Sequence, residues 1–303
     1  MKRILPCGAT AGAALALAFG VLGCSHDQAS QHRPATTVVA STDVWGSVAS
    51  AVAGEHATVT SILRGSVDDP HSYEASPAAT AEIIDASLVV YNGGGYDRWV
   101  EKVLAGRPGV ESVDAYSLLY TPVSEAGPAN EHVSYDIPTA TAVAGRIADR
   151  LATIDPPNAT SYRANAAEFG REAATINASA KAIAAAHPSA SVVATEPVAH
   201  YLLAMARLTD LTPTGFASAV EQGDDPSPAD VAAMLDLLES RQVSALLFNP
   251  QTESATTRQI EAAARRAGVP VVTVTETLPS GTDYLTWQRQ TVQQLAAALQ
   301  TNR

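Results

Sequence analysis

The amino-acid sequence predicts an α/β fold of two lobes with parallel sheets, joined by one long rigid helix. Short apolar runs alternate with helical segments in both halves of the chain, which is typical of parallel βαβ units. Between the halves lies an Ala-rich helical stretch of about thirty residues, which at 1.5 Å per residue would extend about 45 Å. The 303 residues, 46% of them hydrophobic, are enough for two lobes with buried cores.

The N-terminus has the features of an export signal. Two basic residues precede an apolar run, 11–21, that is too short to anchor in a bilayer. The run ends in Leu-Gly-Cys at Cys24, which resembles a bacterial lipobox, where the signal is removed before a cysteine that then carries lipid. We therefore expect a signal peptide over 1–23, a lipid on Cys24 and a flexible tether over 24–36. The protein would be exported and anchored to the outer face of the cytoplasmic membrane.

The N-terminal lobe is expected over residues 37–155. Its strands are predicted from β-branched runs and its helices from apolar residues three to four positions apart. Gly93-Gly94-Gly95 lacks the spacing of a phosphate-binding fingerprint and is expected to form a plain turn. The expected strands are Thr37–Ser41, Ala57–Leu63 and Leu88–Tyr91, and the expected helices are Asp43–Val52, Ala78–Asp85 and Arg98–Leu104.

An Ala-rich helical pattern begins after Pro138 and continues to about residue 186, with one break at Asp155. Asp155 is expected to cap a second helix, with two prolines in its first turn. Pro188 would end that helix. We therefore expect the linking helix over 156–187.

The C-terminal lobe is expected over residues 188–303, where βα alternation resumes. Ser227 is a candidate N-cap, and Gly268 a candidate helix end. The expected strands are Ser191–Ala194, Ala245–Phe248 and Val269–Val274, and the expected helices are Val198–Arg207, Pro228–Ser240, Ser254–Ala267 and Asp283–Leu299.

Composition restricts the chemistry that the exported domain can use. Cys7 would be lost with the signal and Cys24 would carry lipid, so the mature domain would contain no thiol and no disulfide. A metal site would therefore use nitrogen and oxygen ligands. The net charge of −12 argues against nucleic acid as a partner, because nucleic-acid affinity comes largely from basic residues on phosphates.

Four side chains stand near the ends of expected elements. His71 comes shortly after the second strand, and His132 directly precedes the Ala-rich region. Glu196 and Glu276 each follow a strand of the C-terminal lobe. Ligands of open α/β sheets bind where strands end, so two residues from each lobe can converge between the lobes.

The motifs around these residues resemble those of the substrate-binding proteins of zinc and manganese ABC importers, the family that includes the ZnuA proteins. The resemblance extends from Val38 to Leu299. Its most specific part is Asp69-Pro70-His71 followed by Pro77. The other matching segments are Val38–Thr42, Ala86–Gly93, Glu131-His132-Val133 with Asp136, Thr195-Glu196 with Tyr201, and Thr275–Leu278.

The resemblance implies a metal-capturing protein with four ligands, one from each segment. Carried over by position, the ligands are His71, His132, Glu196 and Glu276, in a cleft between the lobes. Glu276 stands where the family has Asp, so Asp283 is a nearby alternative, and His200 is an alternative to Glu196. We prefer Glu276 and Glu196 because each directly follows a strand.

The expected cargo is one divalent transition metal, zinc or manganese. Imidazole favours zinc, whereas two carboxylates favour manganese. Zinc-binding members of the family that the chain resembles often carry a His-rich loop before the second histidine, and residues 121–130 contain no histidine, which also favours manganese. Zinc nevertheless binds more tightly at almost any such site, so the choice stays open. The resemblance also implies an ABC permease as partner, and we expect a monomer.

Two other function classes fit part of the pattern. An exported metal-dependent hydrolase would need an open metal position for water and a general base. A binding protein for an organic or chelated-metal solute would need an apolar pocket with polar anchors. Some relatives are described as adhesins, but no feature of this sequence tests such a role.

Overall fold

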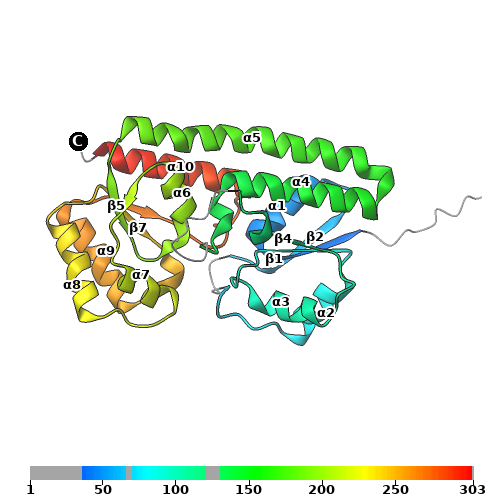
Figure 1. Ribbon diagram of the computed structural model, residues 1–303, viewed down its shortest axis with the longest axis horizontal. Coiled ribbons are helices and arrows are strands. Elements are labelled where there is room, and N and C mark those ends of the chain that lie inside the picture. The colour runs from blue at the N-terminus through cyan, green and yellow to red at the C-terminus, as the bar shows by residue number, and fades with distance from the viewer. Residues whose placement is uncertain (1–35, 66–69, 121–129, 302–303) are drawn as a thin grey trace, which may run out of the picture. The chain divides into compact units, whose positions relative to one another are not determined.

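Two parallel sheets organise the protein, as predicted, and each has four strands. The computed structural model describes residues 36–65, 70–120 and 130–301, the last without the side chain of residue 301 (Figure 1). The first sheet has the order β2-β1-β3-β4 and the second β6-β5-β7-β8, and all strand pairs in the described residues are parallel. The strands are β1 Thr37–Thr42, β2 Thr58–Leu63, β3 Leu88–Tyr91, β4 Ser112–Asp114, β5 Ser191–Ala194, β6 Thr209–Asp210, β7 Leu246–Phe248 and β8 Val271–Thr273.

The helices follow the strands in the order expected of βαβ units. The α-helices are α1 Asp43–Ala53, α2 Pro77–Asp85, α3 Arg98–Ala105, α4 Ile137–Ile154, α5 Ala159–Ala186, α6 His200–Met205, α7 Thr214–Glu221, α8 Pro228–Glu239, α9 Ala255–Ala267 and α10 Tyr284–Thr301. Short 3₁₀ helices are η1 Tyr116–Leu118, η2 Val133–Tyr135, η3 Pro156–Asn158, η4 Pro197–Ala199 and η5 Pro250–Thr252.

Both faces of the first sheet are covered, which explains why its central strands β1 and β3 carry the consecutive apolar residues 38–40 and 88–90. Successive side chains of a strand point to opposite faces. Val38 and Ala40 of β1 accordingly pack in the core that contains α1 and α4, whereas Val39 packs with residues of α2 and α3. Helices therefore cover both faces of the sheet, and loops follow the carboxyl ends of its strands.

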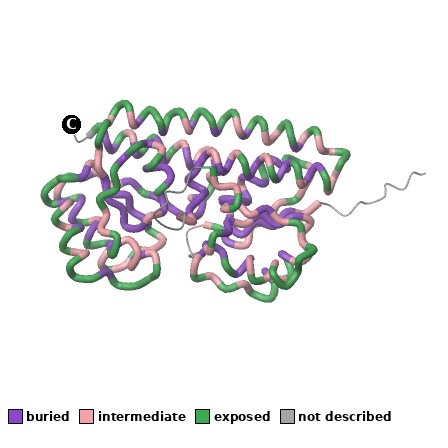
Figure 2. The backbone as a smooth tube through the Cα atoms, in the orientation of Figure 1, coloured by how far each residue is buried: buried purple, intermediate pink, exposed green. Residues whose placement is uncertain are grey.

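The long helix α5 lies along both halves of the fold (Figure 1). It has 28 residues, about 42 Å at 1.5 Å per residue. Its buried residues recur three, four or seven positions apart and form one stripe, while the opposite side is exposed (Figure 2). The stripe packs against α1 and α4 of the first half and α6 and α10 of the second. A single helix of this length therefore restricts how far the halves can move apart.

The start of this helix differs from the prediction. Pro156 and Pro157 form the 3₁₀ turn η3, and α5 begins at Ala159. Asp155 does not cap a backbone N–H, because its carboxylate accepts hydrogen bonds from the side chains of Asn158 at 2.6 Å and Tyr162 at 2.9 Å. The Asp155 carboxylate therefore bonds to side chains instead of capping the helix as expected.

In the second half, both predicted helix boundaries are confirmed. Ser227 caps α8 by accepting the Asp230 N–H at 3.1 Å, and Gly268 ends α9 in the left-handed conformation, with φ 74°. The predicted helix 198–207 is shorter, because η4 occupies its first turn. The strands β4 and β6 and the helix α7 were missed, since each is short and without clear periodicity.

Gly93-Gly94-Gly95 forms the expected turn after β3, with all three residues at positive φ. Asp97 stabilises this turn, because its carboxylate accepts the backbone N–H groups of Asn92 at 2.7 Å and Gly93 at 2.8 Å. A side chain at Gly94 would approach the Tyr116 ring to 2.4 Å. Glycine is therefore required here by both conformation and space.

Cys24, the signal peptide over 1–23 and most of the tether over 24–36 lie outside the described residues. Within the described residues, no helix combines the length and apolarity that a membrane crossing requires.

Candidate metal centre

Three of the four predicted ligand residues bring their ligand atoms together at the carboxyl edges of the two sheets. His71 lies in the loop between β2 and α2, His132 directly precedes η2, and Glu276 follows β8. The Nε2 atoms of the two histidines lie 3.4 Å apart. Oε2 of Glu276 lies 3.3 Å from Nε2 of His71 and 3.6 Å from Nε2 of His132. The three ligand atoms therefore form a nearly equilateral triangle.

The size of this triangle fits a transition metal. Ligand atoms at about 2.0–2.1 Å around a tetrahedral ion stand about 3.3–3.4 Å from one another. The three measured separations lie at or slightly above this value. One ion can therefore contact all three atoms without a large movement of any side chain. The three ligand atoms of this group are two imidazole nitrogens and one carboxylate oxygen.

The three ligand atoms are held close together in a largely buried position, which costs free energy unless a cation binds them. The side chains of His132 and Glu276 are 2% and 1% exposed, and that of His71 is 19% exposed. Oε2 of Glu276 is buried with no hydrogen bond of acceptable geometry.

Burial alone would raise the pKa of Glu276, but the two neighbouring imidazoles outweigh it and hold the pKa well below its usual range. Burial lowers the pKa of His132, and Glu276 more than offsets this, so the pKa is raised.

Glu196 lies at the end of β5, as predicted, but outside this triangle. Its Oε1 accepts a hydrogen bond from the Thr252 hydroxyl at 2.6 Å, and its side chain is buried. Burial, reinforced by repulsion from Glu276, raises the pKa of Glu196. The charge of Glu276 therefore opposes ionisation of Glu196, and a divalent cation bound nearby would remove that conflict.

No lysine or arginine of the described residues forms an ion pair with Glu196 or Glu276. The positive charge that these carboxylates can meet comes from the imidazoles or from a bound cation. Such a charge balance favours cation binding over anion binding.

Neighbouring side chains fix the position of Glu276. Its Oε1 accepts from Nδ2 of Asn249 at 3.2 Å, and its backbone N–H donates to Oε1 of Gln251 at 2.6 Å. The ring of Tyr96 meets the two imidazoles edge-on, with centroids 4.7 Å from His71 and 5.6 Å from His132. The hydroxyl of Tyr96 also donates to the carbonyl of Glu276 at 3.4 Å. This support holds Oε2 toward the histidines.

The alternative ligand residues have other partners. The carboxylate of Asp283 accepts the backbone N–H and the hydroxyl of Thr286 at 2.8 and 2.7 Å, at the start of α10. His200 lies in α6, with its ring against Tyr201 at 5.0 Å, and burial lowers its pKa. Neither belongs to the groups of mutually close ligand atoms found among the described residues.

Sequence reasoning missed several residues around the centre. Glu221, at the end of α7, places Oε1 3.9 Å from Nδ1 of His132, and it forms a second close group with Glu131 and His132. Glu221 and Tyr96 carry no local signal, because tertiary packing alone brings them to the histidines. Asn130 could have been suspected from its position two residues before His132.

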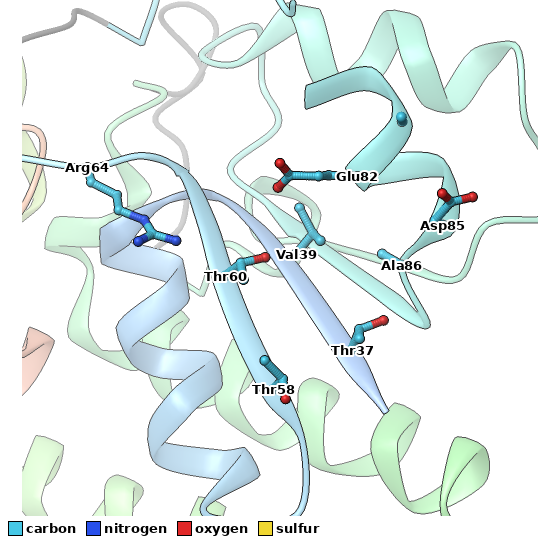
Figure 3. Close-up of a pocket in the computed structure, with 9 residues that line it drawn as sticks. Thr37, Val39, Thr58, Thr60, Arg64, Glu82, Asp85 and Ala86 are labelled. Carbon is cyan, nitrogen blue, oxygen red and sulfur yellow. The ribbon is translucent and has the colours of Figure 1, made fainter. Parts of the chain in front are cut away.

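A separate pocket of about 510 Å³ lies on the first sheet, away from these ligands (Figure 3). Threonine side chains of β1 and β2 face Glu82 and Asp85 of α2 across it, and Arg64 stands at one end. None of the four predicted ligands lines this pocket.

Known proteins of similar sequence are named for metal binding or metal transport. The chain is 26% identical over 268 residues to the manganese-binding lipoprotein MntA of Bacillus subtilis, covering 84% of this chain and 85% of the relative. It is 22% identical over 270 residues to the metal ABC transporter substrate-binding lipoprotein FimA of Streptococcus parasanguinis, covering 85% of each.

Solved structures share the fold. The periplasmic zinc-binding protein TroA of Treponema pallidum superposes with a TM-score of 0.75 at 15% identity, covering 87% of this chain and 99% of that one. The laminin-binding protein Lmb of Streptococcus agalactiae, described as a bifunctional adhesin and metal transporter, gives 0.74 at 24% identity over the same shares. The family described as zinc-uptake complex component A, periplasmic (ZnuA), matches residues 38–298. The chain therefore belongs to the ZnuA family of metal-importer substrate-binding components.

Proposed function

We propose that this protein captures one divalent transition metal outside the cytoplasmic membrane and delivers it to the permease of an ABC importer. The single observation that carries this proposal is the triangle of His71, His132 and Glu276, whose sides match the spacing of ligands around one ion. Family membership agrees with it, since the relatives are substrate-binding components of transporters and not enzymes.

Glu196 is proposed as the fourth ligand. It is buried at the end of β5, and the charges of Glu276 and His132 both act on its pKa, which supports a position close to the triangle. A set of two imidazoles and two carboxylates suits zinc and also tolerates manganese. Four protein ligands would leave no open position for a catalytic water, which argues against the hydrolase.

The capture step would exchange protons for the metal. Closing on the ion replaces its waters and expels any proton held by an imidazole or by Glu196. The long helix α5 limits hinge motion, so release would follow docking on the permease and small shifts of one half. A lipid on Cys24 would keep the monomeric carrier at the outer face of the membrane; stable anchoring needs more than one acyl chain.

The experiment is metal analysis of the purified protein followed by competitive titration with zinc and manganese. One equivalent of tightly held metal, lost in His71→Ala and retained in His200→Ala, supports the proposal, and the competition identifies the ion. His200 is the matched control because it is a nearby histidine outside the triangle. Absence of binding to either ion would reject metal capture and favour an organic solute, whereas metal-dependent hydrolysis lost in His71→Ala would favour the enzyme.

A further inference from the structure

Asn130 lies where the segments of two proposed ligands meet. Its Oδ1 accepts two hydrogen bonds from His132, one from the backbone N–H at 2.9 Å and one from Nδ1 at 3.1 Å. Its Nδ2 donates to the carbonyl of Pro197 at 3.2 Å, and Pro197 directly follows Glu196. The backbone carbonyl of Asn130 also accepts the Tyr201 hydroxyl at 2.6 Å.

The orientation of the Asn130 amide is fixed by its backbone partners. The N–H of His132 can only donate, so the atom facing it must be the amide oxygen. The carbonyl of Pro197 can only accept, so the atom facing it must be the amide nitrogen. Exchange of the two atoms would place two donors together and two acceptors together.

This orientation decides the tautomer of His132. Because Oδ1 of Asn130 only accepts, Nδ1 of a neutral His132 must carry the proton. The lone pair is then on Nε2, which faces Nε2 of His71 at 3.4 Å and Oε2 of Glu276 at 3.6 Å. A histidine ligates a metal through its unprotonated nitrogen, so His132 is presented to the ion in the binding form.

Among the described residues, Glu221 also brings an acceptor close to Nδ1 of His132, but it lies too far away for a hydrogen bond. Its Oε1 is 3.9 Å from Nδ1, beyond hydrogen-bond distance, whereas Oδ1 of Asn130 is at 3.1 Å. The tautomer therefore depends on Asn130, and Glu221 contributes only a nearby negative charge.

We propose that Asn130 is the positioning residue of the metal centre, which fixes His132 in its Nδ1–H tautomer and ties the His132 segment to the Glu196 segment through Pro197. This inference rests on the proposed function for its effect on metal. Its effect on His132 exists in the metal-free protein and is measurable there. Loss of an outer partner of a metal-binding histidine typically weakens metal binding about 10- to 100-fold.

The test compares Asn130→Ala, Asn130→Asp and Glu221→Gln with the unaltered protein. Long-range ¹H–¹⁵N NMR spectra of the metal-free full chain, at a pH where His132 is neutral, report which ring nitrogen carries the proton. The His132 signals are those absent from His132→Gln. A thermal unfolding transition like that of the unaltered protein shows that a variant is folded.

The unaltered protein and Glu221→Gln are expected to show the Nδ1–H tautomer alone. Asn130→Ala should show a mixture of tautomers and bind metal about 10 to 100 times more weakly. Asn130→Asp, which keeps the acceptor but lacks the donor to Pro197, should restore the tautomer but not the full metal affinity. A pure Nδ1–H tautomer in Asn130→Ala, or a change of tautomer in Glu221→Gln, would overturn the inference. If the unaltered protein binds no metal, the proposed function fails, while the tautomer still decides the role of Asn130.

Discussion

Tyr135 and Thr275 exchange two hydrogen bonds between the two halves of the protein. The Tyr135 hydroxyl donates to the carbonyl of Thr275 at 2.8 Å and accepts its backbone N–H at 3.1 Å. Tyr135 follows His132 by three residues, and Thr275 immediately precedes Glu276. The buried hydroxyl thus connects the segments of two proposed ligands that lie 144 positions apart in the sequence.

Tyr135→Phe should destabilise the protein, because it leaves the buried N–H of Thr275 without its partner. The expected loss in the free energy of unfolding is about 1–3 kcal/mol, measured by chemical denaturation. Tyr120→Phe is the control, since Tyr120 is 72% exposed. Equal stability of the two variants would show that the bridge contributes nothing.

Metal affinity should fall as the pH is lowered. The pKa values of His132 and Glu196 are both raised, so protons occupy these groups at a higher pH than usual and must leave when the ion binds. Between about pH 8 and about pH 5, the apparent Kd should rise about tenfold per pH unit for each proton displaced.

The proton released by Glu196 can be isolated with Glu196→Gln. Calorimetry in buffers of different ionisation enthalpy counts the protons released on binding. The variant should release fewer protons than the unaltered protein at the same pH. An affinity that does not change with pH, or identical proton release in the variant, would contradict the coupling.

Asp97 should give the free energy of unfolding a pH dependence of its own. Burial raises its pKa to about 6, although hydrogen bonds from Asn92 and Gly93 oppose the rise. The folded state holds this proton more tightly than the unfolded state does. The resulting stabilisation of the folded state is therefore complete below the ordinary pKa of 3.8 and is lost as the pH rises through about 6. A shift of about two units corresponds to roughly 3 kcal/mol. Carbon-13 NMR of the carboxyl group checks this, and titration near its ordinary pKa would refute it.

Gly94→Ala should destabilise the protein by about 1–2 kcal/mol or more. Its φ of 65° is unfavourable for a residue with a Cβ, and that Cβ would contact the Tyr116 ring. Gly145→Ala is the matched control: it lies in α4, and its added Cβ would have nothing within 4 Å. Helix propensity predicts that this control gains up to about 1 kcal/mol. Thermal unfolding of the two variants measures both effects, and equal melting temperatures would count against the account.

Much of the fold could be predicted because it depends on local patterns. The β-branched run at β1 and the Ser227 and Gly268 helix ends are local signals, and the structure agrees with them. The start of α5 could not be predicted, because Asp155 bonds to side chains of the following turn instead of a backbone N–H. Short elements such as β6 depend on pairing with distant strands.

The candidate centre was only partly accessible from sequence. His71, His132 and Glu276 were found because each stands at an expected element end or within a family motif. The supporting residues Asn249, which holds Oε1 of Glu276, and Tyr96, which packs against both imidazoles, come together only in three dimensions. The roles of all four candidate residues as metal ligands stay predictions.

X-ray absorption spectroscopy of the metal-loaded protein tests the central claim most directly, because it reports the atoms that surround the ion. For zinc, we predict nitrogen and oxygen ligands at about 2.0–2.2 Å and the scattering signature of two imidazoles, without sulfur. The signature should fall to one imidazole in His132→Gln. A spectrum with no imidazole signature, or one unchanged in His132→Gln, would contradict the assignment of the centre.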